Sequence, residues 1–298
     1  MNFTTTIRFA FLIAATATIT SCGSNADNET IGGTDTASTV STEKDTRAQN
    51  VFYSIPSPIE TTSLLKGAGA KYNASYLNPV ENVSKYSTAA SRALNLGIYG
   101  SDLSFTSIFD QTQESMLYLR CTNKLATSLG ISGAFDEATT SRIEANLENR
   151  DSLLTIISDS YWNADTYLKE NGQPGVSALI IAGGWIEGLY IATQIAKATN
   201  NADIATRIGE QKLSLDNLVA LLDSYKTTNE GVNTTFLQLQ ELKTIYDGIE
   251  VKTAETQVST DKKDSVTTID NKSSYKLTSD QLNAITAKAT QIRNKIIQ

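Results

Sequence analysis

Hydrophobic positions recur at spacings of three and four residues along most of the chain between residues 58 and 250, which is the period of amphipathic α-helices. Helix start signals accompany this pattern. Ser57-Pro58-Ile59-Glu60 combines a serine cap, a proline at the first helical position and a glutamate in capping-box spacing, and Asn78-Pro79-Val80-Glu81 repeats that order with asparagine as the cap. We therefore expect helices near residues 58–68, 79–85, 88–109, 111–129, 137–149, 151–170, 174–198, 202–224, 232–248 and 279–297.

This pattern predicts an all-α fold, in which residues 51–250 form a single bundle of about nine to ten antiparallel helices, packed compactly or with a solenoid-like offset. Residues 251–277 are rich in Thr, Ser, Lys and Asp and read as a polar linker or as a short hairpin that turns at Asp270-Asn271. Residues 278–298 form one helix whose apolar stripe is too short for a free coiled coil. We expect this helix to dock on the bundle or on a partner.

The amino-terminal segment begins with Arg8 and the apolar run Phe9–Ala17, which is too short to span a bilayer and has the character of a signal peptide. Ile19-Thr20-Ser21 precedes Cys22 and resembles the lipobox of bacterial lipoproteins. The resemblance implies a signal peptide over residues 1–21, cleavage after Ser21 and lipidation of Cys22. Gly23 in place of an aspartate resembles the sorting signal of outer-membrane lipoproteins. The sequence does not indicate which leaflet of that membrane carries the protein.

Residues 22–50 are poor in branched apolar side chains and predict a disordered tether behind the lipid anchor. Acyl chains bind a membrane strongly because each buried methylene contributes about 0.8 kcal/mol. The predicted location is therefore the cell envelope, with the domain held at a membrane. Asp35-Thr36-Ala37 in this tether, and Asp264-Ser265-Val266 further on, resemble the short O-glycosylation acceptor of Bacteroidota.

Three charged residues stand where the helical period expects apolar ones. Asp102 lies within the stripe of the helix near 88–109, Arg150 interrupts a stripe that continues through the helices on either side of it, and Glu187 is the only charge in "VSALIIAGGWIEGLYIA". A carboxylate in such surroundings needs a partner. We expect a buried polar cluster of Asp102, Arg150 and Glu187, with Arg92 as the second choice of partner for Glu187.

Two functions are open to this cluster. It is a structural polar lock, which is the interpretation we favour, or Asp102 and Glu187 form an acid/base pair of the kind that glycosidases use. A water-filled cleft between the two carboxyls would indicate a hydrolase, whereas a dry cluster sealed by Trp185 and Tyr190 would indicate a structural role. The prediction leans away from an enzyme.

The apolar segment around Glu187 also contains small residues at regular helical spacing, namely Gly183, Gly184 and Gly188. In a membrane this spacing marks a dimerising helix, but the central glutamate argues against a membrane span. We expect these glycines to allow close helix packing against Tyr or Trp neighbours. Trp162 and Tyr167 are a further candidate surface for a sugar ring or a partner, although core filling is the simpler interpretation.

Composition removes several classes of function. The chain has no histidine, so imidazole-based catalytic triads and histidine-ligated metal sites are excluded, and no phosphate-binding glycine loop occurs. No cofactor and no metal site is predicted. With Arg8 removed, 24 basic residues remain against 32 acidic ones, a formal charge of −8 that disfavours nucleic-acid binding.

The runs "VFYSIPSPIE", "NPVENVSKY", "LNLGIYGSDLS" and "GGWIEGLYIATQ" resemble a family of all-helical lipoproteins from Bacteroidota over residues 51–250. The resemblance implies an envelope location and a helical domain, and it brings no activity and no binding residues. We expect a membrane-anchored, non-enzymatic interaction, scaffold or ligand-binding protein whose partner is an envelope protein or a small ligand. The alternatives are the carboxylate hydrolase and a surface glycan-binding lipoprotein.

Overall fold

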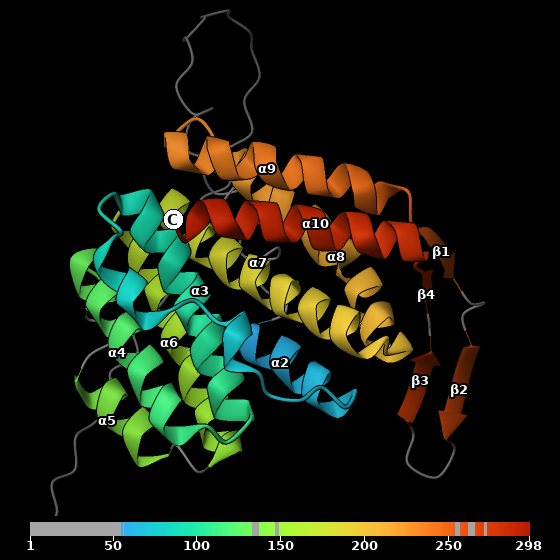
Figure 1. The fold of residues 1–298 in the computed structure, drawn as a ribbon, viewed down its shortest axis with the longest axis horizontal. Coiled ribbons are helices and arrows are strands. Elements are labelled where there is room, and N and C mark those ends of the chain that lie inside the picture. The colour runs from blue at the N-terminus through green and yellow to red at the C-terminus, as the bar shows by residue number, and fades with distance from the viewer. Residues whose placement is uncertain are drawn as a thin grey trace, which may run out of the picture. The chain divides into compact units, whose positions relative to one another are not determined.

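The computed structural model describes residues 55, 57–132, 137–146, 149–253, 257–261, 266–270 and 273–298, which all belong to the second of two units divided between Ser41 and Thr42. The predicted lipobox, the predicted tether, Asp35-Thr36-Ala37 and the pair Asp264-Ser265 lie outside the described residues. The expectation of an all-α bundle is confirmed (Figure 1). The described helices are α2 (Pro58–Gly67), α3 (Ala89–Ile108), α4 (Thr112–Ser128), α5 (Glu137–Ala145), α6 (Arg150–Glu170), α7 (Pro174–Thr199), α8 (Ala202–Tyr225), α9 (Glu230–Asp247) and α10 (Ser279–Ile296).

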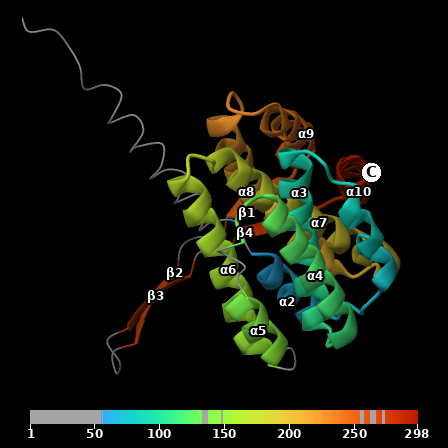
Figure 2. The ribbon, with the colours of Figure 1, turned by 90° about the vertical axis from the view of Figure 1, so that its left-hand side faces the viewer.

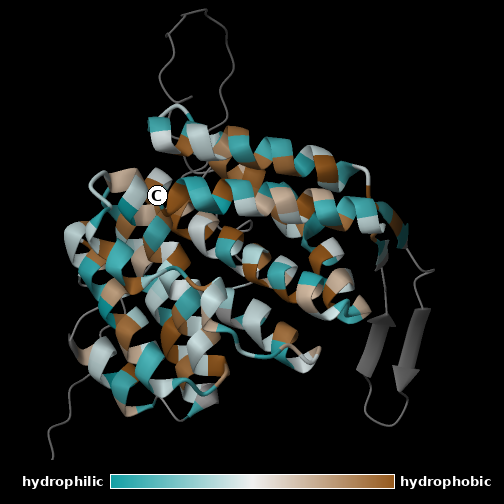
Figure 3. Cartoon of the chain, in the orientation of Figure 1, coloured by the Kyte–Doolittle hydropathy of each residue, from teal (hydrophilic) through white to brown (hydrophobic). Residues whose placement is uncertain are grey.

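Helix α7 is the central element of this unit. Helices α2, α3, α6, α8, α9 and α10 all contact it, and the two views in Figures 1 and 2 show it enclosed by them. Each outer helix carries both hydrophobic and hydrophilic residues, as Figure 3 shows. This is expected because only one side of each outer helix faces the core. Helix α7 is long and apolar enough to cross a membrane, but 83% of its most apolar window is buried by its neighbours.

Local start signals account for several helix boundaries. The predicted capping boxes form at Ser57 with Glu60 and at Thr278 with Gln281, and Pro174 occupies the first turn of α7. The predicted box at Asn78 does not form. Residues 74–76 and 80–84 are short 3₁₀ helices, and the N-cap position of the second is Pro79, which provides no side-chain cap. Asn78 is fully buried and uses its polar groups elsewhere.

Residues 250–276 contain four short strands: β1 (Glu250–Thr253), β2 (Gln257–Asp261), β3 (Val266–Asp270) and β4 (Ser273–Lys276). Strand β1 pairs with β4 and β2 pairs with β3, both antiparallel. The sequence predicted either a polar linker or a short hairpin here, and the described residues form paired strands. Asp270 pairs with Gln257 at the end of β3, so the β2–β3 turn does not lie at Asp270-Asn271. Strand β4 contacts α8, where Tyr275 packs close to Gly209.

The last helix docks on the bundle, as one of the two predicted alternatives had it. Helix α10 packs against α7 and α9, and its stripe residues Ile285, Ala289 and Ile292 are buried. Its position next to α7 brings the carboxy-terminal end of the chain to the start of α3 (Figure 1). This arrangement places a residue of α10 in the centre of the polar cluster described next.

Candidate functional site

Helices α3 and α7 approach each other closely because glycines face the partner backbone. A Cβ atom built on Gly183 would lie 1.9 Å from the carbonyl oxygen of Leu94, and one on Gly97 would lie 2.0 Å from that of Ile180. At Gly184 the nearest atom would be Cγ of Pro58, 3.1 Å away, and at Gly188 it would be Cγ2 of Thr61, 3.4 Å away. The predicted close packing is present, but backbone and α2 side chains take the place of the expected Tyr or Trp neighbours.

This close approach brings Asp102 of α3 and Glu187 of α7 into one buried cluster. Neither residue has any exposed surface. The counter-ion of Glu187 is Arg293 of α10, which is 5% exposed. Its Nε donates to Oε2 of Glu187 at 2.9 Å, and its Nη2 donates to Oε1 at 2.9 Å. The pair is therefore bidentate, the geometry in which guanidinium and carboxylate bind most strongly.

Two further contacts hold the guanidinium of Arg293 in place. Its Nη2 also donates to the carbonyl oxygen of Tyr76 at 3.2 Å, and its Cζ lies 4.6 Å from the centre of the Tyr190 ring. Burial works against a charged guanidinium, but the attraction of Glu187 outweighs it and raises the pKa of Arg293. Arg293 is therefore charged at neutral pH and serves as the counter-ion of Glu187.

Asp102 has a different environment. Its Oδ2 accepts a hydrogen bond from the backbone N–H of Asn78 at 3.2 Å, and its Oδ1 has no hydrogen-bond partner among the described residues. Burial and the neighbouring Glu187 carboxylate raise the pKa of Asp102 well above its usual range, and Arg293 opposes this rise only in part. Two carboxyls beside one arginine favour one ionised and one neutral acid. We assign the neutral form to Asp102.

A network of neutral polar groups extends from this cluster to the end of the chain. Asn78 Nδ2 donates to the hydroxyl of Tyr86 at 3.0 Å, and the hydroxyl of Tyr118 donates to the carbonyl oxygen of Asn78 at 3.2 Å. Asn95 Nδ2 donates to the carbonyl oxygen of Ile296 at 3.0 Å. The network thereby joins α10 to α3, whereas the ion pair joins α10 to α7.

The arginine that pairs with Glu187 among the described side chains is Arg293, which was not predicted. Arg92 donates to the carbonyl oxygens of Tyr86 and Ser128, so it does not serve Glu187, and the side chain of Arg150 lies outside the described residues. The sequence contained a signal for Arg293, since it follows the buried Ala289 by four residues and so lies on the same face of α10. Choosing among arginines required the docking position of α10, which local pattern does not give.

The buried carboxyls do not have the surroundings of an acid/base pair. A hydrolase needs substrate and water between its two carboxyls, whereas Asp102 and Glu187 have no exposed surface and line none of the described pockets. Tyr190 covers Arg293, as expected of a seal. Trp185 does not take part, because its indole N–H donates to Oγ of Ser214 on α8 at 3.1 Å. This arrangement suits a polar lock.

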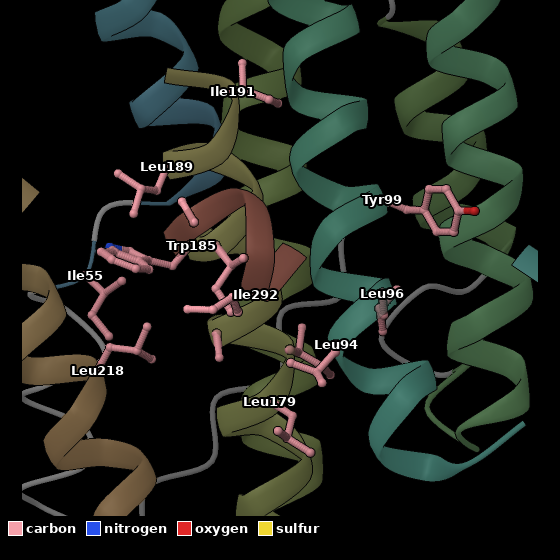
Figure 4. Packing of buried hydrophobic residues seen from close by; sticks show 14 of the residues in the cluster. Ile55, Leu94, Leu96, Tyr99, Leu179, Trp185, Leu189, Ile191, Leu218 and Ile292 are labelled. Carbon is pink, nitrogen blue, oxygen red and sulfur yellow. The ribbon is translucent and has the colours of Figure 1, made fainter. Parts of the chain in front are cut away.

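A pocket of about 330 Å³ lies on another side of α7, between α2, α6 and α7. Both tryptophans of the chain, Trp162 and Trp185, line it. Figure 4 shows the Trp185 ring beside Ile55 and pointing away from Leu96 and Tyr99 of α3. The described lining residues are Ile55, Ser57, Pro58, Glu60, Ser158, Asp159, Tyr161, Trp162, Ile181 and Trp185.

The pocket has a buried floor and an exposed rim. Trp185 is 6% exposed and Trp162 is 36% exposed, while Glu60, Ser158 and Asp159 are exposed on the rim. Tyr167, the predicted partner of Trp162 in an exposed aromatic pair, is exposed but is not among the described lining residues. The missed signal was that Trp185 and Glu187 are two residues apart on one helix, so their side chains must point to different sides of it.

Other candidate chemistry is sparse in the described residues. They contain no group of three or more Cys, Asp or Glu side chains placed to hold a metal ion. Cys121 is buried, and burial raises the pKa of its thiol to about 11. A thiol in this state is a weak nucleophile at neutral pH. The tryptophan pocket is therefore the candidate functional site.

No family model matches the chain, and comparison with curated proteins and with solved structures gives no significant match.

Proposed function

We propose that the protein is a lipid-anchored protein of the cell envelope that binds a small organic ligand, or a side chain of a partner, in the pocket between α2, α6 and α7. The observation that carries the binding function is the tryptophan pocket. Its size is that of small-molecule sites, and its lining combines a mainly apolar floor with a few polar groups, which is how such sites are usually built. The envelope location rests on the lipobox before Cys22.

The sealed polar cluster supports a binding function over the hydrolase alternative. Glu187 is held by two hydrogen bonds from Arg293, and Asp102 is buried beside it, so neither carboxyl is free to meet a substrate. The cluster instead fixes the three helices α3, α7 and α10 with respect to one another. Since α7 also carries Trp185 and Ile181, the same lock holds the floor of the pocket rigid.

Intrinsic fluorescence tests the binding function directly, because both tryptophans of the chain line the pocket. Purified protein is titrated with a panel of small cationic, neutral and anionic compounds, and emission is recorded with excitation at the red edge of the indole band. We expect saturable changes with some of them. The variant Ser158→Leu places a larger apolar side chain on the rim and should weaken binding at least about tenfold.

Ser128→Leu is the matched control for this test, since Ser128 is an exposed serine near the end of α4 and does not line the pocket. It should bind as the unmodified chain does. Absence of any saturable binding across the panel, or equal binding by the Ser158→Leu and Ser128→Leu variants, would reject the pocket as the functional site.

The anchor is tested separately in cells. Metabolic labelling with a palmitate analogue should modify the full chain, and Cys22→Ala should abolish both the label and the membrane fraction of the protein. Mass spectrometry of the mature protein should place the lipid on Cys22. A mature chain with an unmodified Cys22 thiol that fractionates with soluble proteins would contradict the proposed location.

A further inference from the structure

We infer that the tryptophan pocket selects an organic cation: an ammonium or guanidinium group carried on an apolar frame. This inference rests on the proposed binding function and names its ligand class. The class follows from three properties of the pocket, which are its apolar floor, the sign of the charge on its rim and the aromatic rings between them.

The floor requires an apolar frame. Ile55, Pro58 and Ile181 contribute aliphatic surface, and Trp185 contributes the face or edge of a ring whose N–H is already used by Ser214. A polyol would leave hydroxyl groups facing these residues without hydrogen-bond partners, which is unfavourable. A phenyl ring or a short alkyl chain fills the same space at no such cost.

The rim requires a positive charge. The exposed carboxylates of Glu60 and Asp159 lie on it, and no Lys or Arg is present among the described lining residues. Oε2 of Glu60 accepts hydrogen bonds from the backbone N–H of Ser57 at 2.7 Å and from its hydroxyl at 2.9 Å. The capping box at the start of α2 therefore fixes this carboxylate in position, and it makes no ion pair with a described residue. Asp159 likewise makes no ion pair with a described residue.

Aromatic rings lie in the same pocket as the carboxylates. Tyr161, Trp162 and Trp185 all contribute to the lining, and Trp offers the best face for a cation. A cation between a carboxylate and an indole ring is stabilised by both, whereas an anion is repelled by both. The formal charge of −8 on the chain without its leader adds a long-range attraction of the same sign.

Three compounds that share a phenylethyl group separate the contributions: 2-phenylethylamine, 2-phenylethanol and 3-phenylpropionate. They share the apolar frame, and they differ in carrying a positive charge, no charge or a negative charge at pH 7. With the fluorescence titration described above, we expect the amine to bind about tenfold more tightly than the alcohol, and the carboxylate most weakly. Raising the salt concentration should reduce the advantage of the amine, because the rim carboxylates are exposed.

The double variant Glu60→Gln, Asp159→Asn removes the rim charge while keeping the shape of the pocket. Glutamine can still accept the capping-box hydrogen bonds of Ser57, so α2 keeps its start. The variant should bind the amine about as weakly as it binds the alcohol. If all three compounds bind equally to the original chain, or if the double variant keeps its preference for the amine, the cation inference is wrong while the binding function stands. If none binds, the binding function itself loses its support.

Two sources could supply the cation, a free amine or a basic side chain of a protein partner. A blocked peptide Gly-Phe-Lys-Gly and its lysine-acetylated form distinguish them. Binding of the peptide as tight as that of the free amine, and its loss on acetylation, would identify a side chain as a sufficient ligand. Tight binding of the free amine alone would identify a small molecule. Both results support the cation class, whereas equal binding of the two peptides together with equal binding of the amine and the alcohol would contradict it.

Discussion

Trp185 and Glu187 are two residues apart in α7, yet they belong to regions of opposite character. Glu187 points into a cluster that three helices seal, where both carboxyls have no exposed surface and Arg293, the counter-ion of Glu187, is 5% exposed. Trp185 lines a pocket with an exposed rim of like charges and no described counter-ion. In the first region every charge is paired or neutral, which is the rule for interiors. The second region combines exposed carboxylates that make no ion pair with a described residue and an apolar floor, and this combination is the feature expected of a binding site.

The largest expected effect on the stability of the fold comes from removing one partner of the ion pair in the sealed cluster. Arg293→Ala leaves the Glu187 carboxyl buried without its counter-ion, and Glu187→Ala leaves the Arg293 guanidinium buried without its own. Removing one partner of a buried pair typically costs about 3–5 kcal/mol. For a domain of this size we expect the melting temperature to fall by about 10 °C in either variant, as measured by calorimetry or circular dichroism.

Lys288→Ala is the control for this prediction, since Lys288 lies on the same helix and pairs with Glu241 at the surface. That variant should melt close to the unmodified chain, because surface pairs contribute little. The double variant Glu187→Ala, Arg293→Ala should be less destabilised than the sum of the two single variants. Strict additivity would show that the two side chains do not interact in solution.

The stability of the fold should depend nearly as strongly on the close spacing between α3 and α7. Gly97→Ala places a Cβ atom 2.0 Å from the carbonyl oxygen of Ile180, so the helices must separate. We expect a loss of about 1–3 kcal/mol or more in denaturant unfolding. Gly188→Ala is the matched control, because its Cβ would meet Thr61 at an ordinary distance of 3.4 Å. Its stability should be unchanged or up to about 1 kcal/mol higher, since alanine favours the helix. Equal losses in both variants would contradict the close approach.

Much of the fold, but less of the site, could be predicted from the sequence. Local pattern is sufficient for helices, so the boundaries of α3, α7 and α10 were predicted within one or two residues. Asp102 and Glu187 were found because a charge in an apolar stripe is visible in sequence. Asn78 was misassigned because Asn-Pro-x-Glu has the same local appearance whether the asparagine caps a helix or is buried. Arg293 and the pocket depend on how distant helices dock, and no local pattern contains that information.

The pH dependence of stability tests the neutral acid in the sealed region. The unfolded chain releases the proton of Asp102 near the ordinary pKa of about 3.9. Burial and Glu187 raise this pKa in the fold, so the contribution of Asp102 to stability is complete below that pH and declines above it. The decline is about 1.4 kcal/mol per pH unit until the pKa in the folded state is reached.

Asp102→Asn keeps the shape of the neutral acid and does not titrate. Its free energy of unfolding, relative to the unmodified chain, should therefore rise as the pH increases from 4 to 8, as measured by urea unfolding at each pH. Asp110→Asn serves as the control, because Asp110 is an exposed residue that pairs with Lys66. A flat difference curve for Asp102→Asn would show that Asp102 ionises in the fold as it does in water.

The smallest effects should come from the pocket, and they sharpen the contrast between its floor and its rim. Trp185→Phe loses the hydrogen bond to Ser214 and should cost about 1–2 kcal/mol, whereas Trp162→Phe should change stability by less than about 0.5 kcal/mol. Each variant leaves one fluorophore. Acrylamide should quench Trp162 in the Trp185→Phe protein more strongly than Trp185 in the Trp162→Phe protein, because Trp162 is 36% exposed and Trp185 is 6% exposed. Equal quenching would mean that the two rings do not form a rim and a floor, and the ligand titrations would then report on a different geometry.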